Sequence, residues 1–239
     1  MSRLNRFYCP DLPAKAGAFV EFTGDEAHHM ITVLRMRAGQ SVTLFDGKGR
    51  STEAKIVVAG RKAAQMELTA APSVSPPPAF KLTMAIAPMK ADFDELLVRL
   101  AELGVSDAVP VMTEYGEVNF KKREAAKFSG RLEKLAVRAA KQSGNNHLIS
   151  VADQIDLDRL GANVIVCDTE GERQPLHALA QKAGKSATVL IGPEGGFSES
   201  ERAMFRERRY TMASLPGGVL RAATAAMVAA SIMLANKSL

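Results

Sequence analysis

A glycine-rich segment near the carboxyl end of the chain has the composition of a ligand-binding turn. It reads Leu190-Ile-Gly-Pro-Glu-Gly-Gly-Phe-Ser-Glu-Ser-Glu201 and begins in an apolar run typical of a buried strand. We expect Gly195 and Gly196 to take positive φ and to let a ligand approach the backbone. Free N–H groups of the turn and of the helix that follows could then hold polar ligand atoms. A tight turn without a ligand is the alternative. Because the chain has neither G-x-G-x-x-G nor G-x-x-x-x-G-K-[ST], Rossmann and P-loop phosphate binding are not indicated.

A second glycine loop introduces a single arginine. Residues 215–220 read Leu-Pro-Gly-Gly-Val-Leu and precede Arg221. The helix predicted after this loop contains the apolar run 222–235 and is apolar on every side, which is typical of a helix buried in a core or an interface. Arg221 and Thr224 share one face of its first turn. Since an unpaired buried arginine is costly, Arg221 either forms an ion pair, for example with Glu194, or reaches a ligand.

A third feature is a row of basic residues on a helix predicted over 121–142. The apolar stripe of this helix consists of Ala125, Phe128, Leu132, Leu135 and Ala139. About 100° around the axis lies a basic stripe of Lys127, Arg131, Lys134, Arg138 and Lys141. A charged stripe usually marks a helix face that is exposed to solvent, but such a face normally carries both positive and negative side chains. The stripe therefore predicts contact with a phosphate backbone, in keeping with a net charge of +5 over 239 residues.

The elements that position these residues lie on either side of a proline-rich linker, Pro72-Ser-Val-Ser-Pro-Pro-Pro78. Such a segment can neither continue a helix nor lie inside a sheet. Before it, Asp46-Gly47 is a hairpin turn signal, and Thr23 with Glu26 predicts a capping box. That box opens a helix through 27–34, among strands predicted at 41–45, 53–59 and 64–69. Strands with one helix suggest a small β-barrel.

After the linker, strands and helices alternate. Buried strands are predicted at 82–87, 108–112, 164–167 and 187–191, and helices at 92–103, 121–142, 176–182 and 198–208. This alternation predicts an α/β domain with a mostly parallel sheet covered on both faces. Ser198 and Glu201 predict a second capping box at the start of the last of these helices. Asp168 and Thr169 follow a predicted strand, where they could line a site or form its turn.

Composition limits the partners of the chain. Hydrophobic residues make up 46% and charged residues 24%, as in an ordinary packed protein. Cys9 and Cys167 are too few for a disulfide framework, and Cys167 is expected in the core. His28 and His29 are adjacent and so face different sides of a helix, which makes a metal site unexpected. With no signal peptide and no segment long enough to span a bilayer, we expect a cytoplasmic protein with no membrane or metal partner.

The two glycine motifs together resemble the 16S rRNA uridine-N3 methyltransferase family of the SPOUT superfamily. The likeness extends beyond residues 190–201 and 215–226 to the sequence around His28–Arg37 and to the signatures at 101–105 and 140–144. It implies two domains, a PUA-like RNA-binding β-barrel over 1–72 and a SPOUT methyltransferase domain over 79–239. The second domain would contain a trefoil knot, a rare exception to the rule against threaded chains.

The resemblance also implies a cofactor, partners and site residues. S-adenosylmethionine would lie in the knot, and two copies would pair through their SPOUT domains, with 16S rRNA of the small ribosomal subunit as substrate. Residues implied for the cofactor are Leu190, Ile191, Gly192, Pro193, Glu194, Gly195, Gly196, Asp168, Thr169, Leu215, Val219 and Leu220. Those implied for RNA are Arg35, Arg37, Lys90, Lys127, Arg131, Lys134, Arg138 and Asn145.

Methylation at N3 of uracil requires loss of a proton from that nitrogen. Arg221 is the catalytic candidate, because a fixed cation would stabilise the negative charge that develops on the base. No carboxylate is an obvious general base. Gly218, Ala223 and Asn145 differ from the residues that the family usually has at these positions. Two alternatives therefore stay open: a SPOUT methyltransferase acting on another RNA site, and a non-catalytic RNA-binding or ribosome-assembly factor of the same fold.

Overall fold

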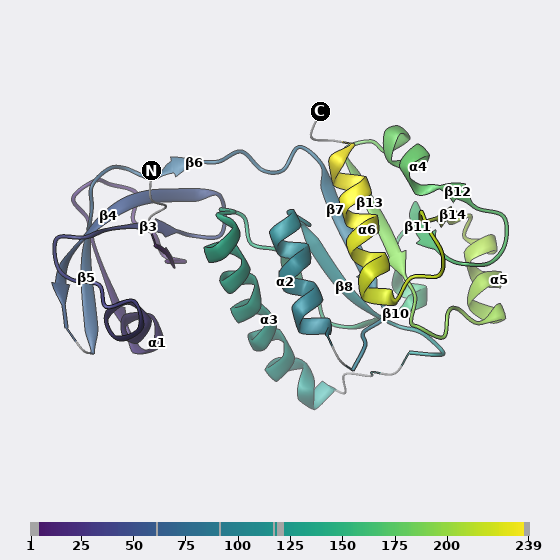
Figure 1. Ribbon diagram of the computed structural model, residues 1–239, viewed down its shortest axis with the longest axis horizontal. Coiled ribbons are helices and arrows are strands. Elements are labelled where there is room, and N and C mark those ends of the chain that lie inside the picture. Colours follow the sequence, from purple (N-terminus) through teal and green to yellow (C-terminus); the bar gives the residue numbers. More distant parts are fainter. Residues whose placement is uncertain (1–4, 61, 91, 117, 119–121, 237–239) are drawn as a thin grey trace. The chain divides into compact units, whose positions relative to one another are not determined.

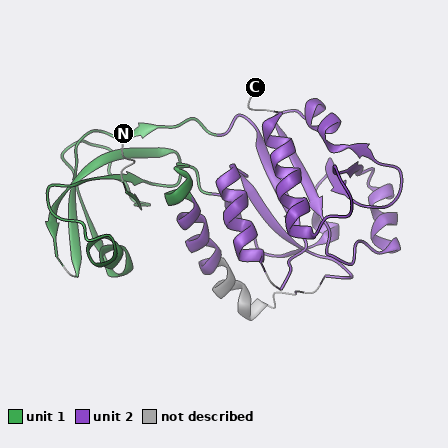
Figure 2. Cartoon of the chain, in the orientation of Figure 1, with its two compact units in different colours: residues 1–77, 140–148 green, residues 78–139, 149–239 purple. Residues whose placement is uncertain are grey.

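The computed structural model describes residues 5–60, 62–90, 92–116, 118 and 122–236, without the side chains of 122–129. The chain divides into two compact units, shown in Figure 2. Unit 1 comprises residues 1–77 and 140–148, and unit 2 comprises 78–139 and 149–239. Residues 140–148 thus pack with unit 1, although they follow the proline linker in the sequence.

Unit 1 is a curled sheet (Figure 1). Its strand order is β1-β3-β4-β5-β2, and β6 pairs with β4. The bounds are β1 Arg6–Tyr8, β2 Phe19–Thr23, β3 Ser41–Phe45, β4 Arg50–Ala59, β5 Ala63–Leu68 and β6 Ser73–Val74. The pair β1–β3 is parallel, and the other pairs are antiparallel. Side chains of β5 alternate between buried and half-buried, so one face of the sheet encloses the core around Phe7, Met30, Leu44 and Met66.

The hairpin predicted at Asp46-Gly47 joins β3 and β4 and is confirmed. The carboxylate of Asp46, which is 1% exposed, accepts hydrogen bonds from the backbone N–H groups of Lys48 and Arg50 at 2.8 and 2.9 Å. It also accepts one from Arg50 Nε at 2.7 Å. Burial opposes ionisation, but these hydrogen bonds hold the pKa of Asp46 below its ordinary value. The turn is therefore built around a buried, satisfied carboxylate.

The first predicted capping box is wrong. Helix α1, Gly24–His28, begins after Thr23, whose side chain accepts no capping hydrogen bond. Gly24 has φ of 60°, so the backbone reverses where an ordinary helix start would bring the Thr23 hydroxyl to the first N–H groups. The Glu26 carboxylate instead accepts a hydrogen bond from Lys141 Nζ at 2.7 Å. A π-helical turn, His29–Val33, continues α1, so the predicted helix is present with a different winding.

Unit 2 contains an all-parallel sheet in the order β10-β8-β7-β13-β11-β14-β12, with β9 beside β8. The strands are β7 Lys81–Ile86, β8 Asp107–Met112, β9 Ser150–Val151, β10 Ile155–Asp156, β11 Val164–Cys167, β12 Gln174–Pro175, β13 Ser186–Ile191 and β14 Thr211–Ser214. The helices are α2 Phe93–Leu103, α3 Lys122–Ser143, α4 Leu176–Lys182, α5 Glu199–Glu207 and α6 Ala222–Ala235. The predicted parallel α/β arrangement is confirmed. Among the described helices, none has the length and apolar character that crossing a membrane requires.

Two apolar clusters cover the two faces of this sheet. Residues of α2, α3, α4 and α6 form one cluster with side chains such as Met84 and Val189. Phe197, Phe205 and Tyr210 form the other with strand residues such as Val166. Cys167 packs against the first cluster, and burial raises the pKa of its thiol to about 12. Its predicted place in the core is confirmed.

Candidate active site at the carboxyl edge of the sheet

Three loops meet where neighbouring strands of unit 2 end. In the register of the sheet, Cys167 of β11 is paired with Ile191 of β13 and with Ala213 of β14. The loops that begin at Asp168, Gly192 and Leu215 therefore leave the same edge side by side. The carboxyl edge of a parallel sheet is where α/β proteins bind ligands. The structure thus brings together the three segments that the sequence suggested for the cofactor.

The glycine turn after β13 is tightly closed. The N–H of Gly196 donates to the Pro193 carbonyl at 2.9 Å, and Gly196 has φ of 73°. Gly195 lies outside the left-handed region, so the positive φ predicted for it is wrong; Gly196 alone makes the reversal in this turn. The side chains of Leu190 and Ile191 are buried in the sheet, which leaves only their backbone to face a ligand.

The second capping box is confirmed, and it also fixes a neighbouring loop. Ser198 Oγ accepts the N–H of Glu201 at 3.2 Å, and Glu201 Oε2 accepts the N–H of Ser198 at 2.8 Å. The other carboxylate oxygen of Glu201 accepts the N–H of Glu114, in the loop after β8, at 2.8 Å. This loop carries Tyr115, which is 50% exposed and lies against Gly195. No sequence motif indicated that Tyr115 belongs to the site.

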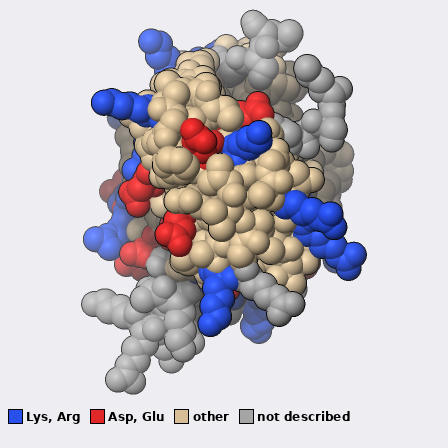
Figure 3. All heavy atoms as spheres, turned by 90° about the vertical axis from the view of Figure 1, so that its left-hand side faces the viewer, with Lys and Arg blue, Asp and Glu red and all other residues tan. Residues whose placement is uncertain are grey.

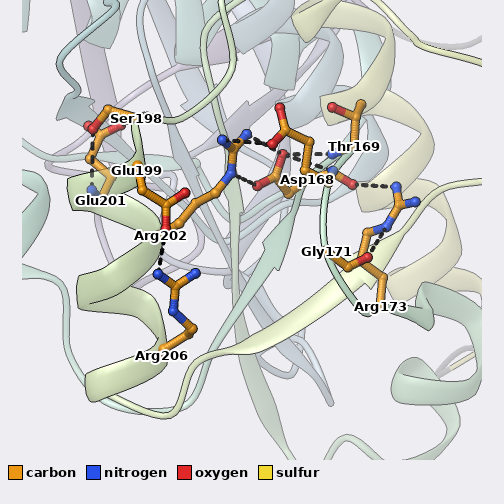
Figure 4. A network of polar contacts seen from close by, with 10 residues as sticks. Asp168, Thr169, Gly171, Arg173, Ser198, Glu199, Glu201, Arg202 and Arg206 are labelled. Atoms are coloured by element: carbon orange, nitrogen blue, oxygen red, sulfur yellow. Dashed lines mark hydrogen bonds and ion pairs between the residues drawn. The ribbon is translucent and has the colours of Figure 1, made fainter.

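Asp168 has a different role from the one expected. Its side chain is 2% exposed, and its oxygens accept hydrogen bonds from Arg202 Nε at 2.9 Å and Nη2 at 3.3 Å. The N–H of Thr169 donates to the same carboxylate at 2.7 Å. Figure 4 shows Arg202 reaching from α5 to this carboxylate, and the hydrogen bond to Asp168 raises the pKa of the Arg202 guanidinium. The carboxylate is therefore directed at the protein, while Thr169 is exposed.

Arg221 is exposed at the first turn of α6. Its carbonyl accepts the N–H of Ala225 at 2.8 Å, which begins the helix. Within the described part of the chain, its side chain has no hydrogen bond or ion pair, so the suggested pair with Glu194 does not form. Helix α6 buries Ala226, Ala229 and Met233, but it leaves other positions partly uncovered. Within the single chain, one face of this helix is therefore in the core, and the prediction that its other apolar positions lie in an interface stays a prediction.

Comparisons with known proteins place this arrangement in a family. Residues 75–234 match the family model described as RNA methyltransferase domain, and residues 22–69 match the RNA methyltransferase PUA domain. Ribosomal RNA small subunit methyltransferase E of Mycobacterium bovis is 30% identical over 237 residues, which cover 93% of this chain and 88% of the relative. This chain belongs to the ribosomal RNA small subunit methyltransferase E family. The predicted family is confirmed, and so is the predicted fold class of a PUA-like domain followed by a parallel α/β methyltransferase domain.

Solved structures agree with this assignment over nearly the whole chain. Ribosomal RNA small subunit methyltransferase E from Neisseria gonorrhoeae, bound to S-adenosyl methionine, has a TM-score of 0.86 and 26% identity, with 97% of each chain covered. A Legionella pneumophila protein in complex with the cofactor SAM has a TM-score of 0.85 and 26% identity, with 98% of each chain covered. Both domains of this methyltransferase are thus shared with its solved relatives.

The residues predicted to contact RNA are divided between the two units of the methyltransferase. In unit 1, Arg35 and Arg37 are exposed, and Asn145 is half-buried. The Asn145 side-chain oxygen accepts the N–H of His147 at 3.0 Å, so this residue also shapes its own loop. In unit 2, the exposed candidates are Lys90 after β7 and, on α3, Arg131, Lys134 and Arg138. The side chain of Lys127 lies outside those described.

The basic stripe on α3 is partly neutralised. Arg131 pairs with Asp94 of α2 at 3.0 Å, and Lys141 pairs with Glu26 within unit 1. On the face shown in Figure 3, Lys and Arg side chains are dispersed, with Asp and Glu side chains among them. Lys134 and Arg138 are the members of the stripe that are exposed without an acidic partner in the described part of the chain. They are the stripe's strongest phosphate candidates.

Proposed function

We propose that this methyltransferase transfers a methyl group from S-adenosylmethionine to N3 of a uridine in 16S rRNA of the small ribosomal subunit. Family membership gives the reaction class, and the names of the relatives point to small-subunit rRNA. The observation that carries the proposal for this chain is the meeting of three loops, 168–169, 192–196 and 215–220, at one edge of a parallel sheet. Arg221 stands exposed directly after the third loop.

The loops fit the cofactor in shape and chemistry. A Cβ on Gly217 or Gly218 would meet nothing within 4 Å, so the backbone here is open to a close approach. Val219 is 85% exposed, an apolar surface suited to cover a purine ring. Leu215 and Leu220 would complete this wall, and the turn from Gly192 to Gly196 would hold polar parts of the molecule. When bound, S-adenosylmethionine supplies an electrophilic methyl group on a sulfonium.

Arg221 is proposed to stabilise the uracil anion. Loss of the N3 proton to solvent leaves negative charge on the base, and a fixed cation beside the base lowers the energy of that state. Arg221 suits this role because its side chain is exposed and has no ion-pair partner within the described residues.

The first prediction concerns this arginine. We expect Arg221→Ala to lower kcat about 100-fold or more, the usual effect of removing a group that stabilises transition-state charge, while S-adenosylmethionine binding stays near wild type. Arg221→Lys should retain part of the rate because it keeps the charge. Single-turnover methyl transfer and titration calorimetry measure the two quantities. Near-normal kcat in the alanine variant would show that Arg221 does not act on the base.

Further features of the proposal concern the assembly. We propose a trefoil knot in the methyltransferase domain and a homodimer formed through that domain. We also propose domain limits of 1–72 and 79–239, except that residues 140–148 pack with unit 1. Helix α6 supports the dimer, because the apolar side chains of Met227, Val228 and Ile232 are only half-buried. Substrate rRNA would place the enzyme in the cytoplasm. Analytical ultracentrifugation tests the dimer, and a monomer at micromolar concentration would contradict it.

The decisive experiment is methyl transfer from labelled S-adenosylmethionine to small ribosomal subunits that lack the modification, with mass spectrometry of the rRNA. A single N3-methyluridine in 16S rRNA is the expected result. Methylation of another nucleotide or of tRNA would assign a different RNA target. If the protein neither bound the cofactor nor transferred a methyl group, the alternative of a non-catalytic RNA-binding factor would replace the proposal.

A further inference from the structure

A buried ion pair connects the end of β11 to the first turns of α5. The side chains of Arg202 and Asp168 are 15% and 2% exposed, and two guanidinium nitrogens of Arg202 bind the two oxygens of Asp168. A third nitrogen, Nη1, lies 3.0 Å from Glu170 Oε2, whose side chain is 64% exposed. The guanidinium is thus held by two carboxylates of one loop, as Figure 4 shows for Asp168.

Both ends of this ion pair belong to loops of the proposed cofactor site. Arg202 lies one helical turn after Ser198, to whose carbonyl its N–H donates at 3.0 Å, and the glycine turn leads directly into Ser198. If residue 196 had a Cβ, that atom would lie 3.7 Å from Nη2 of Arg202. Asp168 begins the loop after β11, and its carbonyl accepts a hydrogen bond from Arg173 Nη1 at 3.0 Å. The guanidinium therefore lies beside the glycine turn and joins it to the neighbouring loop.

We propose that Arg202 is a positioning residue for the methyl donor: its fork-shaped contact with Asp168 holds the glycine turn 192–196 in the conformation that binds S-adenosylmethionine. The inference rests on the proposed function. Because bringing two charges out of water is costly, a buried pair of this kind contributes more to a defined geometry than to net stability. The planar guanidinium with two parallel hydrogen bonds fixes orientation in a way that a lysine ammonium does not.

The test separates positioning from mere stability by using two variants. Arg202→Lys keeps the charge and loses the fork. The double variant Asp168→Leu/Arg202→Met replaces the pair by apolar side chains, an exchange that often leaves stability unchanged. We expect both to weaken S-adenosylmethionine binding about ten- to hundredfold, by analogy with the residues that orient the ligands of metal sites. We also expect KM for S-adenosylmethionine to rise in parallel, while kcat at saturating cofactor and saturating small subunits stays within about threefold of wild type.

A matched control is available on the same helix. Arg206 of α5 pairs with Glu199 at 2.6 Å, and both side chains are largely exposed. Arg206→Lys makes the same substitution in an ion pair that includes no residue of the loops 168–169 and 192–196. Its affinity for S-adenosylmethionine, measured by calorimetry, should therefore equal that of wild type. Thermal denaturation of every variant, with and without S-adenosylmethionine, is measured in parallel.

The outcomes are distinct. Wild-type affinity in both Arg202→Lys and the double variant would overturn the inference. So would an affinity that falls in Arg202→Lys and returns in a stable double variant, because that pattern indicates a structural role alone. Failure of the wild-type protein itself to bind S-adenosylmethionine would overturn the proposed function together with this inference. Weak binding in both variants at wild-type melting temperature supports it.

Discussion

Gly192 and Gly218 both lie in the loops of the site, but they are glycine for different physical reasons. A Cβ on Gly192 would lie 2.8 Å from the ring of Phe197. That ring is buried and meets the Phe205 ring edge-on at 5.0 Å, so it has no space to move away. A Cβ on Gly218 would meet nothing within 4 Å. Packing inside the protein explains Gly192, and an open approach to the backbone explains Gly218.

This difference in packing predicts different effects of alanine at the two positions. We expect Gly192→Ala to lower the free energy of unfolding by about 1–3 kcal/mol, the usual effect of overpacking a core. Gly218→Ala should leave it within about 0.5 kcal/mol and should weaken S-adenosylmethionine binding. Denaturant unfolding and titration calorimetry measure the two effects. Equal stability of the two variants would contradict the packing argument for Gly192.

At the scale of single residues, the sequence located the loops but not the contacts beneath them. The glycines of 190–196 widen the local backbone choice and its one proline restricts it, so their role could be predicted from neighbouring residues alone. The ion pair of Asp168 with Arg202 joins residues 34 positions apart, and neither residue has a distinctive local pattern. The one local signal for Arg202 is its place one turn after the capping residue Ser198. Local sequence therefore suggests a ligand contact or a turn residue for Asp168, and it gives no sign of an arginine partner.

At the scale of elements, the two predicted capping boxes provide a controlled comparison. Ser198 and Glu201 form both reciprocal hydrogen bonds, whereas Thr23 forms no side-chain capping bond. We expect Ser198→Ala to lower the free energy of unfolding by about 1 kcal/mol. Thr23→Ala should change it by no more than about 0.5 kcal/mol, because Thr23 is exposed and makes no such bond. Urea unfolding of both variants tests this, and a larger loss for Thr23→Ala would show that its hydroxyl does cap α1.

Long periodic helices and apolar strands were predictable because each has a pattern within its own residues. Helices α2 and α3 begin and end within one residue of the predicted bounds. Strand β14 was missed because Thr211–Ser214 has only two apolar residues, and its strand conformation depends on pairing with β11. The π-helical turn at His29–Val33 was missed for a similar reason, since its residues suit an α-helix equally well. Where tertiary partners decide the conformation, local patterns are insufficient.

At the scale of the whole molecule, helix α3 links the two units in a way that the linker did not suggest. It begins in unit 2, and its last residues belong to unit 1 with the loop that follows. Asn146 in that loop accepts a hydrogen bond from Arg6 Nη2 at 2.6 Å and donates to Ser51 and Ser75 at 3.0 and 2.8 Å. The chain therefore passes between its units three times: at the proline linker, within α3, and after residue 148. Contacts between residues so distant in sequence cannot be derived from local composition.

The ion pairs on α3 also change which of its cations are available to RNA. Arg131 and Lys141 are paired with Asp94 and Glu26, whereas Lys134 and Arg138 are exposed and lie four residues apart on one face of the helix. We therefore expect Lys134→Glu/Arg138→Glu to weaken binding to small-subunit rRNA. The slope of log K against log salt concentration should become shallower by about 1.4–1.8, which corresponds to two lost phosphate contacts.

A charge-matched control tests whether this effect is local. Lys182, at the end of α4, and Lys185, just before β13, are exposed at the sheet edge opposite the site loops. The variant Lys182→Glu/Lys185→Glu changes the net charge by the same amount, so a general electrostatic effect would lower affinity equally in both double variants. If α3 contacts RNA, the slope of log K against log salt concentration should change in Lys134→Glu/Arg138→Glu alone. The reason is that counterions are released only where phosphates are neutralised. Filter-binding titrations from about 50 to 200 mM salt, over which the Debye length falls by about half, decide between the two. Equal slopes in the two variants would remove α3 from the RNA interface.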